Sequence, residues 1–196
     1  MSSPPASRPR VGTATLPGAD DRRANHRWET ACDEHQVALA AYLDTAAAVA
    51  DEAWTRPWAP GKWTPAQITE HLSLAYEAGL TEIATGQGMK EKLHGWRQRV
   101  TRWVFLPHIL FHRSFPVRAR SPREIRPPET PALPRPEALR RLRELGERFE
   151  VELDRARRSG GGRLTHPYFG KIEPVKGMRF FAVHLEHHAR QVARAK

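Results

Sequence analysis

Three histidines close to the end of the chain, His184, His187 and His188, lie on one predicted helix. Side chains four residues apart on a helix project only about 40° from each other, one turn along the same face. His184 and His188 can therefore present two nitrogens to one metal ion, at the spacing of the HExxH zinc helix. No Glu follows His184, so the protease chemistry of that motif is not expected. His187 projects about 100° from His188, which favours an orienting or surface role over metal ligation.

A third ligand has to come from another element, and His71 is the best candidate. Thr64, Pro65 and Gln67 form a strong helix start, which places His71 one turn in, on the core-facing side of a second helix. Three neutral imidazoles leave a fourth tetrahedral position open for water or substrate. The alternative is that each imidazole forms its own hydrogen bond, for example with a backbone carbonyl. A shared metal explains all three inward-facing polar groups together, so we favour it.

Apolar spacing predicts four long helices that could position these histidines. The stripes alternate steps of three and four residues, and no alternating run suggests a sheet. Four helices with one long connection between the second and the third predict an all-α protein with a four-helix bundle and a long crossover. The predicted ranges are Trp28 to Ala50, a helix that starts after Thr64, Pro136 to Arg158, and Pro174 to Arg194.

The 196 residues suffice for one domain with a core and are too few to suggest two. Residues 1–25 are rich in Pro, Ser, Gly and Arg and are predicted to be a disordered tail, so the domain would span residues 26–196. Cys32 is the single cysteine, which excludes an internal disulfide and a Cys-rich zinc site. The absence of a secretion signal and of long apolar runs leads us to expect a cytoplasmic protein.

The positive charge is concentrated in a Pro-rich insertion, residues 88–135. Between residues 90 and 126 there are ten basic and two acidic residues, which is +8 of the formal net charge of +10. Its apolar residues are interrupted by Pro107, so we expect the segment to be helical only in part. Three interpretations remain open: a lid that selects an anionic substrate, a surface that binds acidic lipid, and a nucleic-acid patch. Interleaved tryptophans and arginines favour the first two, and nucleic acid is the least favoured partner.

Two sequence motifs resemble the DinB/YfiT-like superfamily. They are Pro60 to His71, Pro-Gly-Lys-Trp-Thr-Pro-Ala-Gln-Ile-Thr-Glu-His, and His166 to Lys171, His-Pro-Tyr-Phe-Gly-Lys, followed by the His184 to Gln191 run. They particularly resemble a branch of unknown function whose members carry a His-Pro-Phe-Phe-Gly loop. The resemblance implies an up-down-down-up four-helix bundle with metal ligands at His71, His184 and His188.

The resemblance also implies a zinc or nickel ion and chemistry on a small molecule. Family members of known activity are metal-dependent transferases or isomerases that use low-molecular-weight thiols such as bacillithiol and mycothiol. We therefore expect a metal-dependent hydrolase or thiol-dependent transferase; the alternative is a non-catalytic metal-binding or membrane-surface module. A homodimer is left open. Residues predicted to orient the ligands or line the site, each with surface exposure or loop packing as its alternative, are His187, Gln191, Glu70, His166 and Tyr168.

Overall fold

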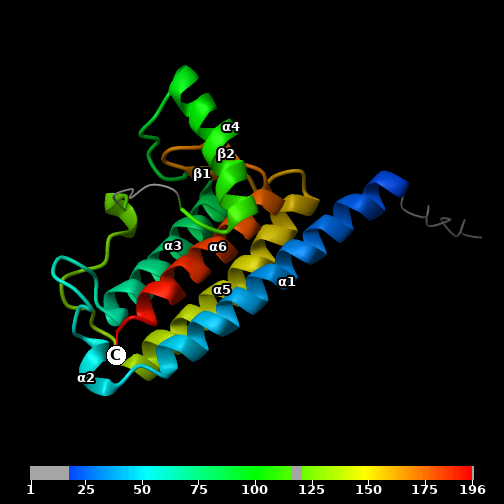
Figure 1. Ribbon diagram of the computed structural model, residues 1–196. Coiled ribbons are helices and arrows are strands. Elements are labelled where there is room, and N and C mark those ends of the chain that lie inside the picture. The colour runs from blue at the N-terminus through cyan, green and yellow to red at the C-terminus, as the bar shows by residue number, and fades with distance from the viewer. Residues whose placement is uncertain (1–17, 116–120, 196) are drawn as a thin grey trace, which may run out of the picture.

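The computed structural model describes residues 18–115 and 121–195, and most of them are helical (Figure 1). In chain order the elements are α1 (Ala19–Ala47), α2 (Asp51–Trp54), α3 (Pro65–Thr85), α4 (Gly95–His112), the 3₁₀ turn η1 (Arg123–Ile125), α5 (Arg135–Arg158), β1 (Leu164–His166), β2 (Gly170–Ile172) and α6 (Pro174–Val192). None of the helices in these ranges is long and apolar enough to cross a bilayer.

Four long helices, α1, α3, α5 and α6, pack lengthwise against one another. α1 lies mainly against α6, and α3 lies mainly against α5. Figure 1 shows α1 and α6 running in one direction, with α3 and α5 running in the other. Because α3 and α5 are parallel, the connection between them must return along the molecule, and it carries α4 and η1.

A buried aromatic cluster sits where the helices meet. The Phe149 ring of α5 is fully buried, and its centroid lies 5.4 Å from that of Tyr76 on α3 and 4.4 Å from that of Phe181 on α6. Gly79 allows this packing, because a Cβ there would lie 2.8 Å from a Phe149 ring carbon. The cluster therefore fixes the distance between α3 and α5 and the position of α6 against both.

The predicted start of α3 is confirmed in detail. The Thr64 hydroxyl accepts a hydrogen bond from the Gln67 backbone N–H at 3.1 Å, and the Gln67 side chain accepts one from the Thr64 N–H at 3.0 Å. Pro65 occupies the first helical position, where its missing N–H costs nothing. This capping box fixes where α3 starts, and therefore where His71 falls in the helix.

One boundary prediction was wrong. α1 begins at Ala19, so residues 19–25 are helical and do not belong to an irregular tail; residues 1–17 lie outside the described residues. Asp20 and Asp21 stabilise the first turn through the helix dipole. No apolar stripe marked these turns because Trp28 is the first buried residue of α1, whose N-terminal end extends beyond the other helices in Figure 1.

The expectation of no sheet was also wrong, since β1 and β2 form a short antiparallel hairpin that pairs Leu164 with Ile172 and His166 with Gly170. Strands of three residues are too short to show an alternating pattern.

Pro107 does not interrupt α4, which continues through it to His112. Pro107 and Trp103, whose carbonyl loses its helical partner, are both exposed, so water can solvate that carbonyl.

We expect Phe149→Ala to reduce the free energy of unfolding by about 3–5 kcal/mol, because it leaves a cavity among the rings of Tyr76 and Phe181. Urea unfolding followed by circular dichroism measures this loss. Val151→Ala on the same helix is the matched control: Val151 is 59% exposed, and the change should stay within about 0.5 kcal/mol. Equal losses in both variants would show that the cluster does not hold the helices together.

Candidate metal centre

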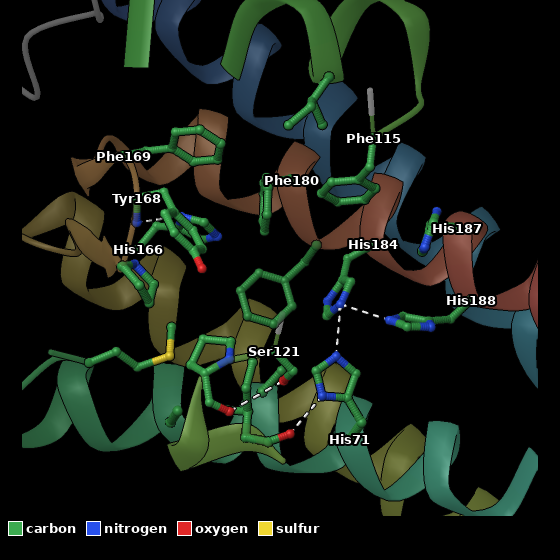
Figure 2. Close-up of a pocket in the computed structure, with 18 of the residues that line it drawn as sticks. His71, Phe115, Ser121, His166, Tyr168, Phe169, Phe180, His184, His187 and His188 are labelled. Atoms are coloured by element: carbon green, nitrogen blue, oxygen red, sulfur yellow. Dashed lines mark hydrogen bonds between the residues drawn. The ribbon is translucent and has the colours of Figure 1, made fainter. Parts of the chain in front are cut away.

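Three imidazoles from two helices meet at one point. The Nε2 atom of His184 lies 3.1 Å from Nε2 of His71 and 3.0 Å from Nε2 of His188 (Figure 2). His71 comes from α3, while His184 and His188 are one turn apart on α6. One nitrogen from each ring lies within 4.8 Å of the other two, so the group fits a divalent metal ion. The structure thus brings together the three residues that the sequence predicted as ligands.

His71 is held from the side opposite to this meeting point. Its Nδ1 lies 2.6 Å from the backbone carbonyl oxygen of Ile125 in η1, and a carbonyl can only accept, so Nδ1 carries the proton. Burial lowers the pKa of His71 to about 4, which makes the ring neutral at physiological pH. A neutral ring protonated at Nδ1 has its lone pair on Nε2, the atom that faces His184.

His188 is oriented in the same manner by a side chain. Its Nδ1 lies 2.9 Å from Gln191 Oε1, which accepts the proton, and Gln191 Nε2 donates to His187 Nε2 at 2.9 Å. Burial, followed by the proximity of His71, lowers the pKa of His188 well below its usual range. His188 therefore also presents the lone pair of Nε2 to His184.

These two tautomers leave an electrostatic conflict that a cation would resolve. His184 Nε2 faces two nitrogens that each present a lone pair, and a single proton on His184 can satisfy only one of them. The pKa of His184 is held well below its usual range, first by burial and then by His188 and His71, so a second proton is unfavourable. A divalent ion held by these residues would accept all three lone pairs. Ligand nitrogens at about 2.0–2.1 Å from a tetrahedral ion lie about 3.3–3.4 Å apart, slightly more than the two distances from His184.

The three imidazoles border a cavity of about 1030 Å³. Figure 2 shows the Phe115 and Phe180 rings beside His184. Phe105 and Ile109 of α4 also line the cavity, which shows that the insertion forms part of its wall. Other large apolar side chains in the lining are Trp58, Trp63, Ile68, Met89, Ile125, Leu164, Phe169, Ile172 and Phe181. An apolar enclosure of this size accommodates a small organic molecule next to the histidines.

Four of the five further predicted residues line the same cavity: His187, Gln191, His166 and Tyr168. Glu70 is not among the lining residues. Its carboxylate accepts a hydrogen bond from Arg141 of α5 at 2.8 Å, so it joins α3 to α5. Proximity to His71 in sequence was misleading here because adjacent helical residues project about 100° apart.

His166 is a neutral, oriented donor in the cavity wall. Its Nδ1 accepts the Tyr168 backbone N–H at 3.2 Å, which leaves the proton on Nε2, and its ring stacks on Phe169 with centroids 4.4 Å apart. Burial lowers its pKa to about 3. The β1–β2 hairpin thus adds a fixed polar group to a largely apolar cavity.

Sequence reasoning missed two contributors. The first is the Ile125 carbonyl, which is a backbone group and cannot be recognised from the residue type. Glu82 of α3 is buried in the cavity wall, where its carboxylate accepts the Thr165 backbone N–H at 2.7 Å and the Thr165 hydroxyl at 2.5 Å. This contact ties the hairpin to α3. A charged residue on an otherwise apolar helix face was the signal that could have identified it.

A family model described as the DinB superfamily matches residues 34–192. This range includes α3, α5 and α6 in full, the C-terminal half of α1, and all three histidines of the centre. Comparison with curated proteins gave no match, and comparison with solved structures gave none either.

We expect the metal-free protein to lose stability as the pH falls from 6.5 towards about 4. His71 has a pKa of about 4 in the folded chain against an ordinary 6.5, so the unfolded state takes up the proton first. The contribution of His71 is fully present above pH 6.5, is lost on acidification, and amounts to about 3 kcal/mol. Urea unfolding in the presence of a chelator, at several pH values, measures it. His71→Asn retains a donor for Ile125 but does not titrate, and its stability should fall less over the same pH interval; an unchanged fall would contradict the assignment.

Proposed function

The chain belongs to the DinB superfamily, which is metal-binding, and we propose that it is an enzyme that holds a divalent metal ion through His71, His184 and His188. The observation that carries this proposal is the convergence of three oriented imidazole nitrogens at the wall of a large apolar cavity. Imidazole ligands suit both zinc and nickel, and we propose one of these two ions for the site. We also infer that α1, α3, α5 and α6 form the up-down-down-up bundle of the superfamily, supported by their directions in Figure 1.

The reaction we propose is hydrolysis of a small molecule or transfer of a low-molecular-weight thiol to it. When bound, the metal would supply Lewis acidity and lower the pKa of a thiol or water at its open position. The chain contributes the rest. Ile125 and Gln191 fix the tautomers of His71 and His188, the aromatic wall excludes water, and the Nε2–H of His166 is available to a polar group of the substrate.

A non-catalytic metal-binding module is the second candidate. It is supported by two carboxylates of α3 that are already engaged, Glu70 with Arg141 and Glu82 with Thr165. The cavity favours the enzyme, because a purely structural metal site is closed by its fourth ligand and needs no adjacent space. The single cysteine is consistent with the cytoplasmic location that we expect for either function.

We expect the protein to bind about one equivalent of divalent metal, with His184→Ala binding less than a tenth as much. Elemental analysis after dialysis against zinc or nickel and gel filtration measures this. The matched control is His26→Ala, which removes an exposed imidazole of α1 and should leave the metal content unchanged. If the wild type and both variants contain equally little metal, the proposed centre does not exist.

We expect the metal-loaded protein to accelerate reactions between thiols and small electrophiles, or the hydrolysis of activated esters and amides. A panel of both reaction types, followed by mass spectrometry, tests this. Activity that disappears in His184→Ala and survives in His26→Ala supports the enzyme. Full metal loading without turnover of any member of the panel would favour the non-catalytic module.

A further inference from the structure

Exposed apolar side chains are concentrated on α4. Among the described residues, seven large hydrophobic side chains are exposed, and five of them lie on this one helix. Trp103 is 77% exposed and Phe111 80% exposed, values that are unusual for aromatic rings. The other three are Trp96, Val100 and Val104.

The five exposed residues form one stripe. At about 100° per residue they fall within an arc of about 100° around the helix axis, which is the width of a packed helix face. Another side of α4 is already covered in its second half, where Leu106, Ile109 and Leu110 are buried against a cluster that includes Phe169, Ile172 and Val183. Figure 1 shows the first half of α4 projecting away from the long helices. α4 therefore has two apolar faces, and the structure covers only one of them.

Positive charges border the exposed stripe. Arg97 lies on one side of it and Arg99 on the other, with Arg102 further round the helix. Within the part of the chain that the structure describes, no acidic side chain forms an ion pair with these three arginines. Lys90 is exposed just before the helix. The Arg97 guanidinium lies 5.6 Å from the Trp96 ring, which keeps charge and aromatic surface together.

We propose that α4 binds the surface of an anionic lipid bilayer, with its exposed stripe in the interface and its arginines on the lipid headgroups. Tryptophans at the interface, aliphatic residues between them and arginines on the flanks are the features of a helix that lies in the membrane plane. Val100 and Val104 offer nothing to a nucleic acid, which needs aromatic faces or hydrogen bonds. A symmetric dimer through this stripe would bring arginine rows of like charge together.

The proposal goes beyond the metal centre and does not depend on it. The two features are nevertheless close in space, because Thr101, Phe105 and Ile109 of α4 line the cavity from inside. A bilayer bound to the outer stripe would lie about one helix diameter, roughly 10 Å, from that lining.

Co-sedimentation with vesicles tests the proposal on the full chain. One set of vesicles contains phosphatidylcholine alone, and the other contains about a third phosphatidylserine. We expect binding to the anionic vesicles, weak or no binding to the neutral ones, and weaker binding at 0.5 M salt, where charges are screened beyond a few ångströms. Trp96→Ser combined with Trp103→Ser should reduce partitioning at least tenfold. Arg97→Gln combined with Arg99→Gln should reduce it about twenty-five-fold, since each basic residue at an anionic surface contributes about fivefold.

The control is Val151→Ser, which removes an exposed apolar side chain from α5 and should bind like the wild type. Circular dichroism melting of every variant shows whether it is folded. Vesicle binding that is absent, equal on both lipids, or unchanged in the variants overturns the proposal. It is also overturned if the chain ignores vesicles and instead forms dimers that the tryptophan changes dissociate, or binds duplex DNA in a manner that the arginine changes abolish.

Discussion

The structure depends on one constraint: three neutral imidazoles must face each other across the space between α3 and α6 with their protons turned away. Each outer ring meets this constraint through a hydrogen bond on its far side, His71 to the Ile125 carbonyl and His188 to Gln191. Two lone pairs are thereby directed at His184, which has at most one proton to offer. Burial keeps all three rings neutral, so the arrangement prefers a cation to protons. Helix packing, the α3 cap and the insertion all help to position these three rings.

The basic insertion is a structural part of the site. The sequence led us to expect a lid or a surface added to a bundle. In the structure the insertion also contributes to the site in two ways. η1 supplies the carbonyl that orients His71, and α4 supplies part of the cavity wall through Phe105 and Ile109. A charged segment rich in proline therefore completes a site whose ligands lie on other helices. This explains why charge and composition alone gave an incomplete account of it.

The elements that sequence predicted well are those specified by local chemistry. The Thr64–Gln67 capping box and the spacing of His184 and His188 depend on neighbouring residues, so the start of α3 and the ligand face of α6 were predictable. Features that depend on distant contacts were not. The first turns of α1 bury nothing, the β1–β2 hairpin has only three residues per strand, and Glu70 turns to Arg141 on another helix. Which of several inward-facing polar groups joins the site is decided by packing between elements.

The bond between His71 and Ile125 has a consequence for how this protein tolerates change. Its acceptor is a main-chain oxygen, so any amino acid at position 125 that preserves the backbone path keeps it. Replacing the buried Ile125 side chain would disturb its packing in the cavity wall, but it would leave the oxygen that orients the imidazole in place. An insertion or deletion in the connection between α3 and α5 would break the bond, because it would displace the oxygen itself. The length of the connection between α3 and α5, more than its composition, therefore determines whether His71 keeps this hydrogen bond.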